Sequence, residues 1–248
     1  MTGLTVRPVE GLPLFRPGDD LVGAIAAAIA PPRAGDVIVV AQKAVSKVEG
    51  RFARLSEVRV SSQAQALAEA TGKPAALCEL ILSEAAEVMR TRRDLVIVRH
   101  RLGLVAANAG IDASNVGDPD QVLLWPLDPD ASAARLREGL EARFGVPLAV
   151  IISDSLGRAW RIGTVGTAIG VSGLKPLRDR RGETDLFGRV LQATVTGVAD
   201  EIAAAATLVM GEGAEGTPAA IVTGAVYVRD ETARLADMLR PAAEDLFR

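Results

Sequence analysis

The chain alternates short apolar runs with longer segments in which apolar residues recur at helical spacing. The short runs are rich in Val and Ile and are bounded by Gly, Pro or Asp, which is typical of strands. They cover residues 5–10, 36–41, 94–100, 102–108, 147–153, 167–172, 190–196 and 219–224. The longer segments predict helices over residues 20–30, 61–72, 74–89, 132–144, 199–210 and 231–247.

This interleaving of strands and helices predicts a mixed α/β (α+β) fold. The sequence has no long linker, low-complexity tract or internal repeat, so we expect any subdivision to be into lobes rather than separate domains. The polar stretch of residues 177–189 is the least core-like part of the chain. Its composition favours a solvated surface loop over a mobile flap.

Composition narrows the range of partners. The 248 residues are 49% hydrophobic, and 28 Lys and Arg against 31 Asp and Glu give a net charge of -3. This balance argues against a nucleic-acid or anionic-membrane surface and favours small-molecule partners. No apolar run reaches the ~20 residues of a membrane span, and the N-terminus MTGLTVRPVE lacks a signal-peptide core, so the cytoplasm is the expected location.

One cysteine and one histidine limit the chemistry that the chain can perform. Cys78 lies in a predicted helix, where a buried small hydrophobe is the favoured interpretation, and His100 ends a predicted strand as an ordinary strand-end side chain. The sequence therefore excludes an internal disulfide and any imidazole-rich or thiolate-rich metal site. A divalent metal would have to be held by oxygen, which selects magnesium, manganese or calcium over zinc.

Polar residues follow several of the predicted elements directly. QKAVSKVEGR follows DVIVVA, AGIDASN follows LGLVAAN, DSLGRAWRIG follows AVIIS, and MGEGAEGTP follows the helix of residues 199–210. In open sheets that contain parallel strands, ligands bind beyond the carboxyl ends of the strands. We therefore expect these four connections to converge.

Carboxylates stand out among these connecting residues. Asp112, Asp154 and either Glu212 or Glu215 each follow an apolar segment, and Ser155 adds a hydroxyl oxygen. Hard cations prefer such oxygen ligands, although each aspartate taken alone is more often a turn former or helix cap. The three similar settings together favour a metal site without excluding the simpler interpretation.

The phosphate-binding signals are unconventional. The sequence has neither G-x-x-x-x-G-K-[ST] nor G-x-G-x-x-G after a strand, so P-loop and dinucleotide fingerprints are absent. Lys43 and Lys47 lie four residues apart and share a side if their segment is helical, although a solvated surface is the alternative. The segment MGEGAEGTP has two interpretations. In one, its glycines let backbone N–H groups approach a phosphate while a glutamate binds the metal that neutralises it. In the other, Gly211 only caps the helix before an acidic surface loop.

Arg158 and Arg161 flank Trp160 shortly after Asp154. Guanidinium groups suit a phosphate or carboxylate, and the tryptophan could shelter them. The alternative is a surface arginine pair beside one buried tryptophan.

Taken together, these motifs resemble one family. VEGLPLF, GDVIVVAQKAVSKVEGR, NAGIDASN, ISDSLGRAWRIGTVGTAIGVSG and VADEIAAAATLVMGEGAEGTPA occur in order over residues 6–223. They closely resemble the coenzyme F-420-0:L-glutamate ligases, which extend the side chain of a deazaflavin cofactor. The resemblance implies a GTP-dependent ligase that phosphorylates the acceptor carboxylate, joins L-glutamate in γ linkage one or more times, and releases GDP and phosphate. It also implies two divalent cations, Mg²⁺ or Mn²⁺, with K⁺ as a further candidate ion.

The resemblance also assigns roles to residues of this chain. The nucleotide-binding positions are Leu12, Pro13, Leu14, Phe15, Gln42, Lys43, Lys47, Asn115, Gly211, Glu212, Gly213, Ala214, Glu215, Gly216, Thr217 and Pro218. Asp112 and Asp154 resemble ligands of one metal, and Ser155 and Glu212 resemble ligands of the second. Asp112, Asp154 and Lys47 are the expected catalytic residues. Ser155 replaces a common threonine, and the family varies at Gln42 and Lys43.

Quaternary structure and domain content are also implied by the resemblance. The family suggests a homodimer of intertwined subunits and a two-lobed ligase fold of its own class, formed here by residues 1–248 as a single unit. Some members carry a carboxyl-terminal reductase domain, for which this sequence has no room, so we expect a stand-alone ligase. The rival functions are a metal-dependent nucleotide phosphohydrolase and a GTP-binding regulator. The joint presence of the metal carboxylates and Lys47 argues against the regulator.

Overall fold

A five-stranded mixed sheet forms the main body of the protein, whose computed structural model describes residues 3–245. Its strand order is β1-β12-β2-β8-β9. The strands are β1 (Thr5–Pro8), β12 (Ala219–Thr223), β2 (Val37–Ala41), β8 (Ala149–Arg158) and β9 (Arg161–Ser172). The neighbours β2 and β8 are parallel, and the other pairs are antiparallel.

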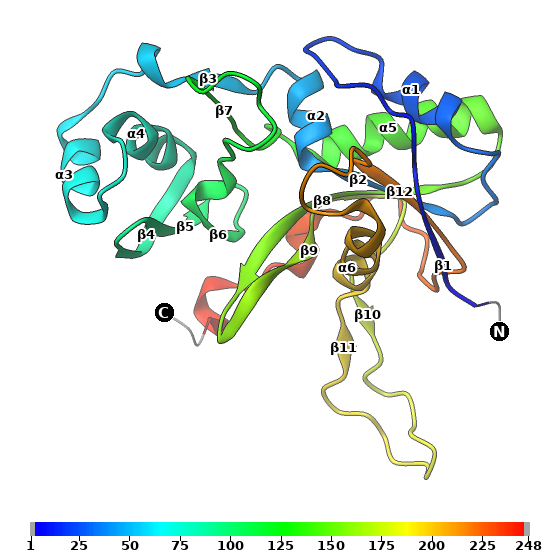
Figure 1. Cartoon of the computed structure of the whole chain (residues 1–248). Coiled ribbons are helices and arrows are strands. Elements are labelled where there is room, and N and C mark those ends of the chain that lie inside the picture. The colour runs from blue at the N-terminus through cyan, green and yellow to red at the C-terminus, as the bar shows by residue number, and fades with distance from the viewer. Residues whose placement is uncertain (1–2, 246–248) are drawn as a thin grey trace.

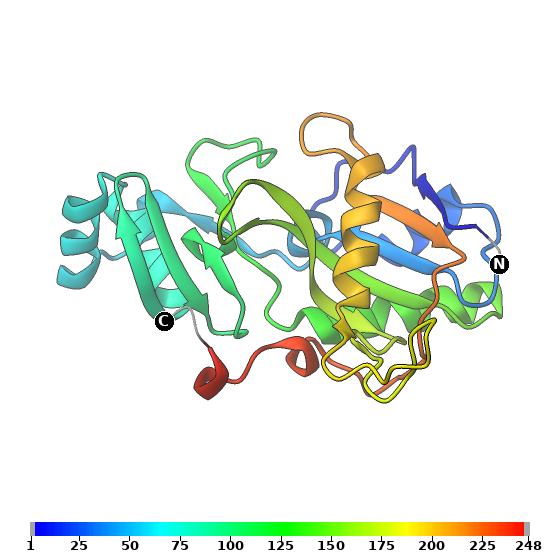
Figure 2. The same cartoon turned by 90° about the horizontal axis from the view of Figure 1, so that it is seen from below.

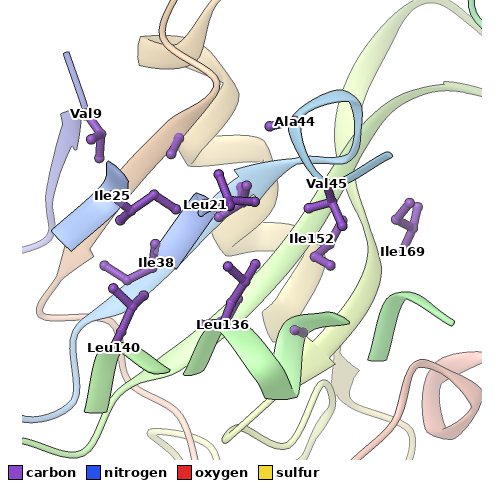
Figure 3. Close-up of a cluster of buried hydrophobic side chains, with 14 of the residues drawn as sticks. Val9, Leu21, Ile25, Ile38, Ala44, Val45, Leu136, Leu140, Ile152 and Ile169 are labelled. Carbon is purple, nitrogen blue, oxygen red and sulfur yellow. The ribbon is translucent and has the colours of Figure 1, made fainter. Parts of the chain in front are cut away.

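Helices cover both faces of this sheet. The helices α1 (Leu21–Ala28) and α5 (Pro129–Phe144) pack on one face, and α6 (Val198–Met210) crosses the other (Figures 1 and 2). In β2, Ile38 and Val40 therefore belong to the core beneath α1 and α5, which Figure 3 shows in close-up, whereas Val37 and Val39 belong to the core beneath α6. Two covered faces explain why β2 reads as a continuous apolar run.

A smaller body lies beside the main sheet (Figure 1). It consists of α3 (Ser62–Thr71), α4 (Ala75–Glu84) and a sheet of β4 (Ala85–Arg92), β5 (Leu95–His100) and β6 (Val105–Ala107). The buried side chains of Ile81, Val96 and Val98 form a separate core there. The antiparallel pair β3 (Phe52–Arg54) and β7 (Gln121–Leu123) belongs to the connections with the main body. The short helices η1 (Leu55–Glu57) and η2 (Asn108–Gly110) complete this half.

An exposed arm extends from the main body over residues 178–196 (Figure 1). Its base is paired by β10 (Arg178–Asp179) and β11 (Val195–Thr196), and an isolated antiparallel bridge joins Thr184 and Val190 farther out. The arm contains the polar stretch expected at the surface, and its residues Leu186 and Phe187 are almost fully exposed. Within residues 3–245, no helix has the length and apolarity needed to cross a membrane.

The mixed α/β prediction is confirmed, and four of the predicted helices correspond to α1, α3, α5 and α6. The helix predicted over residues 74–89 is wrong in its last five residues. It ends at Glu84, and residues 85–92 form β4, which pairs with β5. The segment AAEVM has ordinary helical propensity, but the backbone pairing offered by β5 outweighs that weak local preference.

Two other predicted elements are mostly irregular. The strand predicted over residues 190–196 is limited to β11, because the rest of this segment meets the facing limb of the arm only through the isolated bridge Thr184–Val190 and irregular backbone hydrogen bonds. The helix predicted over residues 231–247 is replaced by the short 3₁₀ helices Leu235–Met238 and Ala242–Glu244, and residues 246–247 lie outside the described residues. Pro241 accounts for the interruption, since proline lacks the N–H of a helix interior and disfavours helical backbone before it.

Candidate active site

The carboxyl ends of β2 and β8 lie at the same edge of the main sheet. Ala41 is the register partner of Ser153 in this parallel pair. Helix α2 (Gln42–Val48) therefore starts beside the point where β8 reaches Asp154 and Ser155. The expected convergence of these two connections is confirmed.

Asp112 comes to this edge from the connection between η2 and β7. Its Oδ2 lies 2.7 Å from Lys43 Nζ, and its Oδ1 accepts the Ser114 backbone N–H at 2.6 Å. Burial works to raise the pKa of Asp112, yet the hydrogen bonds from Lys43 and Ser114 hold that pKa below its ordinary value. Asp112 is therefore ionised and paired with an ammonium group at neutral pH.

Asp154 accepts hydrogen bonds from two uncharged donors. Its Oδ2 accepts the Trp125 Nε1–H at 2.7 Å, and its Oδ1 accepts the Ser155 N–H at 2.9 Å. Burial raises the pKa of Asp154 to about 6 despite these hydrogen bonds and the attraction of Lys43, and the charge of Asp112 adds to the rise. Asp154 therefore lies within the electrostatic influence of both Lys43 and Asp112.

The acidic glycine loop after α6 reaches Ser155 through one of its two glutamates. Ser155 Oγ donates a hydrogen bond to Glu212 Oε1 at 2.5 Å. The side chain of Glu215 instead turns back on its own loop, where Oε2 accepts the Gly213 N–H at 2.7 Å. The structure thus brings Glu212, rather than Glu215, to the end of β8.

Lys47 and Asn115 connect α2 to the same loop. Lys47 Nζ donates to the Asn115 carbonyl oxygen at 2.7 Å, and Asn115 Nδ2 donates to the Gly213 carbonyl oxygen at 3.2 Å. Burial lowers the pKa of Lys47, with the neighbouring charge of Lys43 acting in the same direction and that of Asp112 opposing it. Two lysines and three carboxylates from separated segments are therefore gathered in one region.

The segment of residues 12–15 lies near α2, because the following Gly18 donates its N–H to the Val48 carbonyl oxygen at 2.9 Å. Leu14 is 89% exposed, whereas Phe15 is buried in the main core. The Phe15 side chain therefore anchors this segment and leaves Leu14 at the surface. Gln42, also an expected nucleotide contact, is buried, and its Oε1 accepts the Ser46 Oγ–H at 2.8 Å.

The position of Trp160 differs from both interpretations of the sequence, a tryptophan that shelters the arginines and a buried tryptophan beside them. It lies at the tip of the β8–β9 hairpin with φ 64° and is 90% exposed, so it neither shelters the arginines nor lies buried beside them. A tight hairpin turn, which places this residue away from any core, explains the exposure. Arg158 and Arg161 are also exposed, and Arg158 Nη2 donates to the Ile162 carbonyl oxygen at 3.2 Å.

The donor set at this edge fits a hard divalent cation. Carboxylates from Asp112, Asp154 and Glu212 and the hydroxyl of Ser155 supply only oxygen, as magnesium and manganese prefer. Among residues 3–245, no group of three or more His, Cys, Asp or Glu side chains is arranged around an ion site. Asp112 is instead paired with Lys43 and Glu212 with Ser155. The assignment of these four residues as ligands stays a prediction.

Trp125 is the site residue that sequence reasoning missed. It is fully buried just after β7, and its only polar side-chain atom points at Asp154. Gly110 has φ 68°, and a Cβ built on it would lie 2.1 Å from Trp125 Cε2. The glycine of the NAGIDASN motif was a signal that something packs closely there, but the sequence did not indicate what.

A covered mixed sheet with carboxylates, lysines and a glycine loop at one edge has the features of an enzyme for anionic substrates. Residues 11–224 match the family described as F420-0:Gamma-glutamyl ligase. The chain belongs to this family and is a ligase, which confirms the resemblance drawn from the sequence motifs.

The similarity to curated relatives covers nearly the full chain. The proteins named coenzyme F420:L-glutamate ligase from Methanothermobacter thermautotrophicus and Methanopyrus kandleri are each 45% identical to it. The first match covers 99% of both chains and the second 100% of both. The protein of the same name from Archaeoglobus fulgidus is also 45% identical, over 98% of this chain and 96% of its own.

Proposed function

We propose that this protein joins L-glutamate to coenzyme F420-0 in γ linkage, one or more times, and uses GTP to activate the acceptor. The names of three relatives with 45% identity over nearly their whole length support the acceptor and the amino acid. The observation that carries the mechanism is the joining of three distant segments at one sheet edge. These are α2 with Lys43 and Lys47, the Asp112–Asn115 loop, and the acidic glycine loop that contacts Ser155.

Amide formation from a carboxylate requires a leaving group. An acceptor carboxylate oxygen attacks the γ-phosphorus of GTP, the bond to the bridging oxygen breaks, and GDP leaves with the electron pair. The glutamate amine then attacks the acyl carbon, an amide bond forms, phosphate leaves, and the amine proton is released. Positioning and charge stabilisation account for most of the catalysis of such transfers. This is consistent with a site that contains lysines and carboxylates rather than a nucleophilic cysteine.

The chain's own residues have distinct tasks in this proposal. Lys47 binds nucleotide phosphate, and the backbone N–H groups of residues 211–218 wrap it, since glycines permit close approach. Asp112 and Asp154 would hold one Mg²⁺ or Mn²⁺, and Ser155 and Glu212 would hold the second. When bound, the cations shield the repulsion between the nucleotide and acceptor anions. K⁺ remains a candidate for a further ion.

A homodimer is part of the same proposal. Large apolar side chains are exposed at the tips of two projecting hairpins, with Ile162 on one and Leu186 and Phe187 on the other. Exposed large apolar side chains that gather on projecting segments are typical of protein interfaces. A second copy of the chain is the partner proposed for these tips.

The decisive experiment supplies purified protein with F420-0, L-glutamate, Mg²⁺ or Mn²⁺ and either GTP or ATP, and measures product mass and nucleoside diphosphate. We expect each added glutamyl unit to be matched by one GDP, with little product from ATP. GDP release that ignores glutamate would identify a nucleotide phosphohydrolase. GTP binding without turnover would identify a regulator. Either result would refute the proposed ligation.

A further inference from the structure

Trp125 lies directly behind the site and contacts both segments that carry the aspartates. Its indole is fully buried, and Nε1–H donates to Asp154 Oδ2 at 2.7 Å. An indole N–H can only donate, so it cannot coordinate a cation and can only orient a group that accepts. The other Asp154 oxygen accepts the Ser155 N–H at 2.9 Å. Each carboxylate oxygen thus has one donor from the protein and one free acceptor direction.

The same indole supports the chain next to Asp112. A Cβ built on Gly110 would lie 2.1, 2.3 and 2.5 Å from Trp125 Cε2, Nε1 and Cζ2, so the ring occupies the space that any other residue at position 110 would need. The strand before Trp125 also pairs with Asp112 directly. Asp112 N donates to the Leu123 carbonyl at 3.0 Å, and Leu123 N donates to the Asp112 carbonyl at 2.8 Å. Residues 123–125 therefore fix the Asp112 backbone and the Asp154 side chain at once.

Neighbouring side chains fix the position of Trp125. The His100 ring is fully buried and lies 4.7 Å from the indole ring, centroid to centroid, at 49°. Arg51 Nε donates to the Trp125 carbonyl at 2.8 Å, and Arg51 Nη2 lies 3.2 Å from Glu84 Oε1. His100 Nε2 lies 3.3 Å from Glu84 Oε2, although without the alignment of a hydrogen bond. Packing and a buried ionic cluster therefore leave the indole little freedom to rotate.

We propose that Trp125 is a positioning residue of the ligase. Its indole N–H orients the Asp154 carboxylate so that the free acceptor directions point into the candidate active site. Its ring packs on Gly110 and so helps to position Asp112 in the same site. The inference rests on the proposed cation-dependent ligation. The indole does for Asp154 what outer hydrogen-bond partners do for metal-binding carboxylates in general, namely fix their orientation. Without the donor, the carboxylate could rotate, and its share in holding a cation would weaken.

The test is Trp125→Phe, which keeps an aromatic ring against Gly110 and His100 and removes the N–H. We expect the apparent affinity for Mn²⁺ to fall by about 10–100-fold, as is usual for loss of such a partner. This would be measured by calorimetric titration of the protein with Mn²⁺ and by the Mn²⁺ dependence of ligation. Turnover should recover in excess Mn²⁺, a rescue that a merely structural defect would not allow.

The matched control is Tyr227→Phe. Tyr227 Oη donates one hydrogen bond to the Gly35 carbonyl at 3.2 Å, beyond the opposite end of β2. This variant loses one aromatic donor as Trp125→Phe does, and its Mn²⁺ affinity should equal that of the wild type. A Trp125→Phe protein with wild-type Mn²⁺ affinity would overturn the inference while leaving the ligase proposal intact. Failure of the wild type to ligate would instead defeat the ligase proposal, and the Mn²⁺ titration would still decide the role of Trp125.

A second measurement covers the case in which Trp125→Phe does not fold. In a Trp160→Phe background, incorporation of β-(3-benzothienyl)alanine in place of tryptophan replaces only the N–H of Trp125 by sulfur. The same background labelled with ¹⁵N-tryptophan gives a single indole resonance, which should shift when Mg²⁺ is added. Weaker Mn²⁺ binding by the sulfur analogue and a Mg²⁺-dependent indole shift support the inference. Unchanged binding or an unmoved resonance refutes it.

Discussion

Replacing Asp154 by asparagine should make the metal-free protein more stable at neutral pH. Burial raises the pKa of Asp154 from 3.8 to about 6. A rise of about 2 units corresponds to about 3 kcal/mol between the two protonation states. Because the pKa of Asp154 is higher in the folded than in the unfolded protein, protonated Asp154 stabilises the fold relative to ionised Asp154. This contribution is fully present below about pH 4 and is lost as the pH rises through about 6. The residue is half-buried, so about 3 kcal/mol is an upper limit.

The asparagine amide offsets part of the stability gained by removing the buried charge of Asp154. The two Asp154 oxygens accept N–H groups from Trp125 and Ser155, and asparagine has only one oxygen. One donor therefore loses its acceptor, at about 1 kcal/mol. We expect Asp154→Asn to be more stable than the wild type by about 2 kcal/mol at pH 7.5 and less stable by about 1 kcal/mol at pH 4. Ligation should be largely abolished in the variant.

The assay is urea unfolding, with EDTA present, at a series of pH values from 4 to 8. The control is Asp130→Asn, because Asp130 also accepts two backbone N–H groups, from Val171 and Leu235, and burial raises its pKa as well. Asp130→Asn should show the same sign of pH dependence and retain ligation. Parallel stability curves for the wild type and Asp154→Asn over this pH range would refute the reasoning, as would wild-type ligation in Asp154→Asn.

Three further predictions follow from the packing and the loops. Gly110→Ala should lower the free energy of unfolding by at least about 3 kcal/mol, because the added Cβ clashes with Trp125. The control Gly117→Ala also has positive φ but no atom within 4 Å of the added Cβ, so it should lower the free energy of unfolding by only about 1–2 kcal/mol. Equal losses in chemical denaturation would contradict the close packing of Gly110 on Trp125. Glu212→Gln should reduce the ligation rate by more than the about 10–100-fold typical of outer-shell partners. Glu215→Gln should have a smaller effect, and a reversed order in steady-state assays would show that the wrong glutamate was assigned. Ile162→Asp should convert the proposed dimer to monomers in sedimentation velocity, and an unchanged species would remove the β8–β9 tip from the interface.

The sequence predicts best where a residue pattern has one structural solution. The apolar run Val37–Ala41 and the run of residues 149–153 are short, bounded and apolar throughout, which is typical of strands covered on both faces, and the structure pairs them as parallel neighbours. The polar residues after them then had to meet. This rule covers the connections after β2 and β8, but Asp112 follows β6 of the smaller sheet and the glycine loop follows α6, so the strand pattern does not explain why these two segments join them.

The failures arise where distant contacts decide the outcome. Residues 85–92 have helical composition and become a strand only because β5 lies beside them. Trp125 stands alone between predicted elements, and its role depends on Gly110 and Asp154, which lie 15 and 29 residues away in sequence. The family resemblance treats residues 12–15 as one nucleotide-facing segment and does not indicate that the Phe15 side chain packs in the core. Local sequence does not contain this information.

The choice between the two loop glutamates shows how one backbone position can decide chemistry. Gly211 follows α6 with φ 75° and ψ 176°, a region essentially restricted to glycine, and its N–H still bonds to the Thr207 carbonyl. It therefore caps the helix and also redirects the chain, while phosphate binding by this loop stays a prediction. This turn leaves Glu212 facing Ser155 and lets Glu215 accept the Gly213 N–H within the loop. A left-handed cap of the usual kind would send the chain, and with it Glu212, in another direction.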